Sequence, residues 1–186
     1  MKQFLALMLA GLTFPAAVFA SDRDDDFDNT PVYSFDLGRY LGKWYEIARF
    51  DHYFEKGISN ATAFYSLNDN GTVKVVNSGW KNGKFKVSEG KAKQPNPVEK
   101  PALMRVSFFG PFYSDYRVLM LDTEYQYALV GSGDDDYLWI LSREPMLDPV
   151  VKDFILIEAE KRGYDTDELI WVDQTENIKE KFGIRQ

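Results

Sequence analysis

Residues 42–51 read GKWYEIARFD and predict a β-strand over residues 44–51 with apolar side chains on both of its faces. Successive side chains of a strand point in opposite directions. With Trp44 taken as inward, every second residue shares its face, which holds Trp44, Glu46, Ala48 and Phe50. The opposite face carries Tyr45 and Ile47, and an apolar outer patch of this kind needs a cover. The first strand is therefore expected to be buried on both sides.

Seven further strands are predicted downstream, each bounded by turn residues. Residues 68–71 (NDNG) and 82–83 (NG) are tight hairpin signals, because Asn and Gly tolerate the positive φ that such turns need. Residues 94–101 contain three prolines and read as a loop. The expected strands cover residues 59–67, 72–80, 84–93, 102–109, 115–122, 125–132 and 137–143. Eight strands joined by short connections favour an antiparallel up-and-down meander.

Closure of this meander into a barrel is expected, because an open sheet would leave two exposed edges that invite aggregation. Eight strands enclose room for one small ligand. A helix is predicted over residues 149–162, where Asp148 can cap its start and Gly163 ends it, and it is the natural cover for the first strand. The sequence therefore predicts an all-β fold: an eight-stranded antiparallel up-and-down β-barrel, one C-terminal α-helix packed on its outside, and a short ninth strand at residues 169–172.

The N-terminal residues 1–20 predict a secretory signal peptide instead of a folded segment. A basic start is followed by a short apolar run and by small side chains before the expected cleavage point, and the run is too short to span a membrane. An acidic linker and lead-in is expected over residues 21–35, the barrel domain over residues 36–174, and a C-terminal tail over residues 175–186. The protein is thus expected to be exported, either to the periplasm or out of the cell.

Composition narrows the function further. The chain contains no cysteine, which excludes disulfides, thiol catalysis and thiolate zinc sites, and predicts that no lipid anchor of the bacterial kind follows the signal peptide. A formal net charge of −7 argues against nucleic acid as a partner, because its phosphates require a basic surface. Aromatic residues make up 16% of the chain and suit the walls of an apolar ligand site. A small hydrophobic ligand is the expected partner, with no cofactor and no metal.

Three motifs carry a resemblance to a known family. Residues 42–45 match the G-x-W-Y motif that opens the lipocalin barrel, residues 123–125 (TEY) are similar to the T-D-Y motif before the seventh strand, and Arg143 matches the third motif. Longer stretches most resemble the bacterial outer-membrane lipocalins and the apolipoprotein D group: residues 44–54, 106–113 and 137–145. The structural motif residues are then Gly42, Trp44, Tyr45, Thr123, Tyr125 and Arg143.

The resemblance implies a closed barrel floor, in which Trp44 lies across the bottom and Arg143 stacks over its ring. Such a cation–π contact is worth about 0.5 to 2 kcal/mol. The bacterial relatives carry a lipidated cysteine after the signal peptide, which this sequence lacks. The prediction is therefore a soluble periplasmic or secreted protein. Peripheral contact with the outer membrane and the choice between monomer and homodimer are left open.

The resemblance also implies which side chains line the interior around a fatty acid, lysophospholipid or related lipid. Together with Glu46, Ala48 and Phe50, these are Tyr65, Val75, Asn77, Met104, Val106, Phe108, Tyr116, Val118, Tyr137 and Trp139. Polar groups available to orient a ligand head are Glu46, Tyr65, Asn77 and Tyr116. The alternative is that these side chains fill the barrel completely.

Catalysis is not expected, although two alternatives remain open. The sole histidine, His52, follows the first strand without a G-x-S-x-G elbow to pair with, and its simplest position is the barrel mouth. It could serve an enzyme on a lipocalin barrel or ligate haem iron in a tetrapyrrole carrier. Glu46 and Glu89 form a further candidate, a carboxylate pair for hydrolysis if both face inward.

Overall fold

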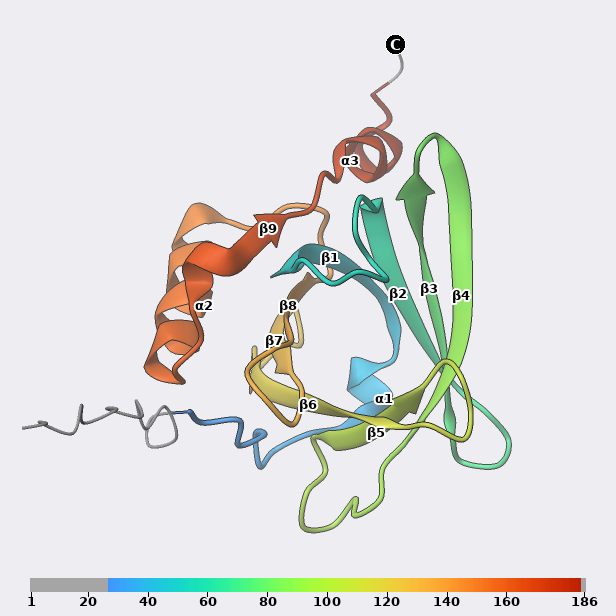
Figure 1. The fold of residues 1–186 in the computed structure, drawn as a ribbon, viewed down its shortest axis with the longest axis vertical. Coiled ribbons are helices and arrows are strands. Elements are labelled where there is room, and N and C mark those ends of the chain that lie inside the picture. The colour runs from blue at the N-terminus through green and yellow to red at the C-terminus, as the bar shows by residue number, and fades with distance from the viewer. Residues whose placement is uncertain (1–26, 185–186) are drawn as a thin grey trace, which may run out of the picture.

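Nine strands form one sheet in the computed structural model, which describes residues 27–184 (Figure 1). The strands are β1 (Gly42–Phe50), β2 (Ser59–Leu67), β3 (Val73–Lys81), β4 (Lys84–Lys93), β5 (Leu103–Ser107), β6 (Ser114–Leu121), β7 (Tyr127–Gly131), β8 (Leu138–Ser142) and β9 (Leu169–Trp171). Their order is β2-β3-β4-β5-β6-β7-β8-β1-β9, and β2 also pairs with β1. The first eight strands therefore close into an antiparallel up-and-down barrel, and the predicted fold class is confirmed. The predicted signal peptide lies outside the described residues.

Strand β1 closes the barrel and then changes partner along its length. Its first half pairs with β2, from Gly42 opposite Tyr65 onward, and its last three residues pair with β9 on the outside. The pairing with β8 shifts register between Glu46 and Ala48, which marks a β-bulge. A bulge adds one residue to one strand and so reverses which side chains face inward beyond it.

The bulge overturns part of the predicted lining. Ala48 and Phe50 are buried in the outer cluster, together with Ile155 of the helix over residues 149–161 and Leu169 of β9, and do not face the interior. Their predicted interior position is wrong, because strict alternation from Trp44 does not survive the extra residue. Arg49 takes the inward position instead, opposite the inward-facing Trp139.

Two apolar clusters lie on opposite faces of the closed sheet. The inner cluster surrounds Trp44 inside the barrel. The outer cluster lies between the sheet and α2 (Pro149–Lys161). Asp148 caps α2 by accepting a hydrogen bond from the Val150 amide, as a helix start with proline at its first position favours. Figure 1 shows α2 outside the barrel, with β9 between it and β1.

Two short α-helices, and the 3-10 helix η1 (Thr166–Glu168) before β9, were not predicted. Helix α1 (Leu37–Tyr40) lies at the start of the expected barrel domain, just before β1, and Figure 1 places it across one end of the barrel. Helix α3 (Thr175–Phe182) lies in the expected tail, and its cap comes from a distant strand: Asn60 Oδ1 accepts hydrogen bonds from the backbone amides of Glu176 and Asn177. No helix within residues 27–184 is both long and apolar enough to cross a membrane.

The barrel is splayed at one seam. The register of β4 with β5 covers Lys91–Lys93 alone, whereas β4 pairs with β3 along its whole length. The first part of β4 is therefore a sheet edge, and its side chains are exposed. Lys84 and Lys86 lie on this edge, where charge discourages pairing with another chain.

Candidate ligand-binding site

The floor of the barrel is built from α1, the start of β1 and the end of β8. Trp44 is fully buried, and its indole Nε1 donates a 2.8 Å hydrogen bond to the carbonyl of Tyr40. The guanidinium Cζ of Arg143 lies 3.8 Å from the centroid of the Trp44 ring. This is the arrangement that the resemblance implies, and it closes one end of the barrel.

Three tyrosine hydroxyls meet just above the floor. Tyr116 OH lies 2.6 Å from Tyr40 OH and 3.0 Å from Tyr65 OH, so one hydroxyl links the other two. Burial raises the pKa of Tyr65 to about 12 and raises the pKa of Tyr40 and of Tyr116 well above the usual value. All three phenols therefore stay protonated and act as hydrogen-bond donors and acceptors inside the barrel.

An apolar wall rises from this cluster. It combines side chains of β3, β5, β6 and β8 with that of Phe108, which directly follows β5; they pack together on the inner face: Val75, Met104, Val106, Phe108, Val118 and Trp139. Several inward-facing residues keep part of their surface exposed, namely Asn77, Val106, Phe108, Tyr116 and Trp139. Part of the surface of these inward-facing side chains is therefore not covered by other residues of the protein.

Three charged side chains lie together on this wall: Glu46, Arg49 and Glu55. Of these, only Glu46 was predicted to face the interior. Arg49 is 1% exposed, and its Nη1 donates a 2.6 Å hydrogen bond to Glu46 Oε1. Its Nη2 donates to the backbone carbonyls of Glu55 and Ile58, which ties the β1–β2 loop to the strand. The carboxylate of Glu55 accepts a 3.1 Å hydrogen bond from the indole of Trp139. Arg49 was missed because the bulge that turns it inward leaves no clear sequence signal.

Two carboxyls share this one guanidinium, and their pKa values reflect it. Burial, followed by the nearby Glu55, raises the pKa of Glu46 to about 8 despite the opposing effect of Arg49. Burial likewise raises the pKa of Glu55, against the hydrogen bond from Trp139 and the charge of Arg49. Among residues 27–184, two carboxyls, those of Glu46 and Glu55, therefore lie beside the single guanidinium of Arg49.

An aromatic cluster lies at the mouth. The ring of His52 lies 4.3 Å from that of Tyr137 and 5.6 Å from that of Trp139, and it stacks on Phe54 at 5.4 Å, all between centroids. Burial and the charge of Arg49 lower the pKa of His52, so the imidazole is neutral at pH 7. The histidine thus belongs to the rim of the barrel interior.

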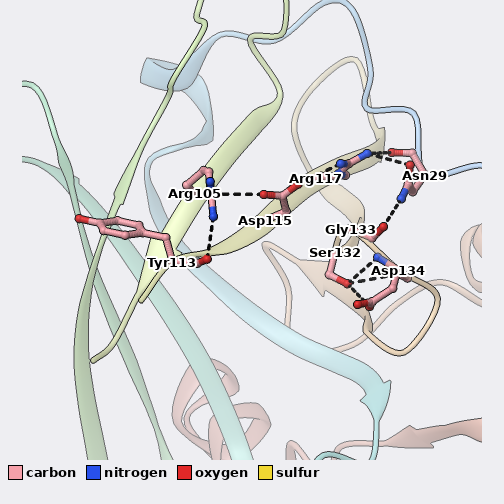
Figure 2. A network of polar contacts seen from close by, with 8 residues as sticks. All are labelled: Asn29, Arg105, Tyr113, Asp115, Arg117, Ser132, Gly133 and Asp134. Carbon is pink, nitrogen blue, oxygen red and sulfur yellow. Dashed lines mark hydrogen bonds and ion pairs between the residues drawn. The ribbon is translucent and has the colours of Figure 1, made fainter. Parts of the chain in front are cut away.

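Polar contacts outside the barrel fix the loops that surround the mouth. Figure 2 shows Asp115 between Arg105 and Arg117 on neighbouring strands. Arg105 donates to the carbonyl of Tyr113 in the β5–β6 loop, while Asn29 accepts from Arg117 and donates to the carbonyl of Gly133. The N-terminal segment is thereby tied to the β7–β8 loop, and two mouth loops are held in place.

Other candidates lie outside the interior. Glu89 faces outward on β4 and pairs with Lys74 at 3.0 Å, so it does not form a carboxylate pair with Glu46. Two hollows of about 380 and 370 Å³ lie on the outer surface, one between the β8–α2 loop and Phe182, the other at the β4–β5 seam beside Phe108. Within residues 27–184, no three His, Asp or Glu side chains gather as a metal site would require.

Comparison with known proteins identifies the family. A sequence model of the lipocalin-like domain matches residues 35–174. Outer membrane lipoprotein Blc of Escherichia coli K12 is 51% identical over 78% of this chain and 82% of its own length. Apolipoprotein D of Mus musculus is 34% identical over 91% of this chain and 96% of its own.

Solved structures with a similar fold support the same family. Insecticyanin of the tobacco hornworm Manduca sexta matches with a TM-score of 0.66 at 25% identity, over 78% of this chain and 84% of its own. The cockroach allergen Per a 4 matches with a TM-score of 0.64 at 25% identity, over 83% and 99% of the two chains. Motifs, barrel topology and sequence identity agree, and the chain belongs to the lipocalin family.

Proposed function

We propose that this lipocalin binds a single-chain amphiphile, such as a fatty acid or lysophospholipid, with its apolar tail inside the barrel. The observation that carries the proposal is the inner wall of Val106, Phe108 and Trp139, which is apolar and partly exposed above a closed floor. Storage or transport of such a ligand requires this lining and no catalytic group.

Energetics favour a lipid tail as the occupant. Burial of about twelve methylenes at ~0.8 kcal/mol each yields roughly 10 kcal/mol. Lost motional freedom and ordering of the tail cancel several kcal/mol of this gain. The remainder is compatible with a dissociation constant near 1 μM, which corresponds to about −8 kcal/mol.

We also propose that the protein works in the cell envelope, where single-chain lipids occur. The support is the name of the bacterial relatives, outer membrane lipoprotein. Fractionation of cells that express the full chain tests this location: recovery in the periplasmic or membrane fraction supports it, and recovery in the cytosol contradicts it.

We propose binding without catalysis. The side chain of His52 packs among aromatic rings, and its Nε2 has no hydrogen-bond partner among residues 27–184, so no serine is placed for it to activate. Incubation of candidate hydrophobic substrates with wild-type protein and with His52→Gln tests this. Turnover that His52→Gln abolishes, with binding retained, would favour an enzyme instead.

Two truncations of the wall test the binding site directly. Trp139→Ala and Phe108→Ala each remove an inner aromatic surface, and delipidated variants titrated with a fluorescent fatty acid should bind at least about tenfold more weakly than wild type. Phe85→Ala is the matched control, because Phe85 lies on the outer face of β4 and is 56% exposed. Unchanged affinity in both inner variants, with a normal circular dichroism spectrum, rejects this site.

A further inference from the structure

We propose that the Glu46–Arg49–Glu55 group is an ammonium-binding site that makes the barrel prefer amphiphiles with a cationic nitrogen in the head. This inference rests on the proposed function, because it names the chemistry of the ligand's polar end. The inference is about which charge of a ligand head is favoured beside Glu46, Arg49 and Glu55.

The charge count points to a missing cation. Arg49 is the one guanidinium beside two carboxyls, and it contacts Glu46 by a 2.6 Å ion pair while Glu55 lies close enough to raise the pKa of Glu46. A second positive charge from a ligand would let both carboxyls ionise together. A carboxylate head would add a third acid to a single cation, which the low-dielectric interior disfavours.

The hydrogen bonds leave acceptors available for that cation. Glu46 uses Oε1 for Arg49, and Glu55 uses Oε2 for the indole of Trp139. Among residues 27–184, no group donates a hydrogen bond to Glu46 Oε2 or Glu55 Oε1, although the Glu46 side chain is only 11% exposed. An ammonium group has N–H donors for such oxygens, whereas a carboxylate has none.

Arg49 itself is poorly placed to receive an anion. Its terminal nitrogens already donate to Glu46 Oε1 and to the carbonyls of Glu55 and Ile58, and the side chain is 1% exposed. Its Nε has no hydrogen-bond partner among residues 27–184, but it is fully buried and an anion would have to displace the surrounding groups to reach it. The guanidinium therefore acts as a fixed internal cation that holds the β1–β2 loop. Competition for it by a ligand carboxylate would break these contacts.

Aromatic faces complete the site. Trp139 donates to Glu55 and stacks on Tyr137 at 5.9 Å between centroids, and the neutral ring of His52 lies beside both. Indole and phenol faces attract ammonium groups by cation–π interaction. The carboxylate of Glu55 is thus flanked by aromatic groups that suit a positive charge.

Three ligands of equal tail length test the proposal by competition against a neutral fluorescent probe at pH 7 and 0.15 M salt: dodecylammonium, dodecanol and dodecanoate. Wild type should bind dodecylammonium about tenfold or more tightly than either of the others. Glu46→Gln and Glu55→Gln should each bring the three affinities within about threefold. Glu89→Gln is the control, because Glu89 lies on the outer face and should keep the wild-type preference.

The possible outcomes distinguish failure of the ammonium site from failure of the proposed binding function. Dodecanol binding without a preference for dodecylammonium overturns the ammonium site and leaves the carrier function standing. Equal or tighter binding of dodecanoate overturns it as well, and so does a preference that persists in both inner variants. Failure of all three ligands to displace the probe from wild type contradicts the proposed function itself. Two separate variants, each checked by circular dichroism, guard against loss of folding in one.

Discussion

The guanidinium Cζ of Arg143 lies over the indole of Trp44, 3.8 Å from its centroid, and the guanidinium nitrogens donate hydrogen bonds to the carbonyls of Arg39, Tyr40, Leu41, Lys43 and Tyr125. One side chain at the end of β8 thus joins α1, the start of β1 and the β6–β7 loop. These contacts seal the floor and set how deep a ligand tail can reach.

Arg143→Ala should lower the free energy of unfolding by about 3 kcal/mol, because it removes the cation–π contact and leaves several backbone carbonyls without their donor. Arg143→Lys should recover little of this, since an ammonium cannot reach all of those carbonyls at once. Urea denaturation followed by circular dichroism measures both. Lys43→Ala is the control, because Lys43 contacts only the face of Tyr45 among the rings described. A loss under 1 kcal/mol in Arg143→Ala would contradict the role of the floor.

Tyr116→Phe should destabilise the protein by about 1 to 2 kcal/mol, because its hydroxyl is the shared partner of Tyr40 and Tyr65 and both would be left buried without it. Thermal unfolding of the variant measures the loss. Tyr113→Phe serves as its control, since the ring of Tyr113 faces Lys93 and its hydroxyl makes no hydrogen bond within residues 27–184. Equal stability of the two variants would show that the hydroxyl cluster contributes nothing.

Many inward-facing residues could be predicted from two reference residues, Trp44 and Arg143, and from the alternation of side chains along a strand. Alternation outward from Trp44 and back from Arg143 places Glu46, Trp139 and Tyr137 correctly relative to the inner face. Alternation failed where the backbone departs from it. The bulge after Glu46 depends on how β1 fits β8, which is a tertiary property that no local pattern encodes.

The helices show the same limit. Helix α2 has its own start and stop signals and was predicted to within one residue at its end, at Lys161. Helix α3 has no side-chain cap of its own, and Asn60 supplies the cap from β2. A helix stabilised by a residue 116 positions away cannot be read from the local sequence.

Glu46 should make stability depend on pH. Its pKa is raised from 4.5 to about 8, so the folded state keeps a proton that the unfolded state has lost between these values. Because the native state then binds more protons, stability should fall as pH rises from about 4.5 to about 8 and level off above that. Glu46→Gln, which is neutral throughout, should flatten this part of the curve of unfolding free energy against pH. An unchanged curve in the variant would show that another group titrates.

Gly90→Ala should weaken ligand binding through a neighbouring ring. A Cβ at position 90 would lie 2.8 Å from Phe108 Cδ1 and 2.8 Å from the carbonyl of Ser107, so the Phe108 ring must move. We expect a several-fold loss of affinity for a fluorescent fatty acid and a loss of roughly 1 to 2 kcal/mol in stability. Gly133→Ala is the control, because its Cβ would meet Asp115 at an ordinary 3.7 Å. Full affinity in Gly90→Ala would indicate that Phe108 does not contact the ligand.

The location of a bound tail is the most direct test of the account. A crystal structure of the protein with a lysophospholipid brominated at the tail end would locate the bromine by its anomalous signal. We expect the peak inside the barrel above Trp44, within contact of Met104 or Val118. A peak confined to the outer hollow beside Phe182, or to the seam between β4 and β5, would contradict it.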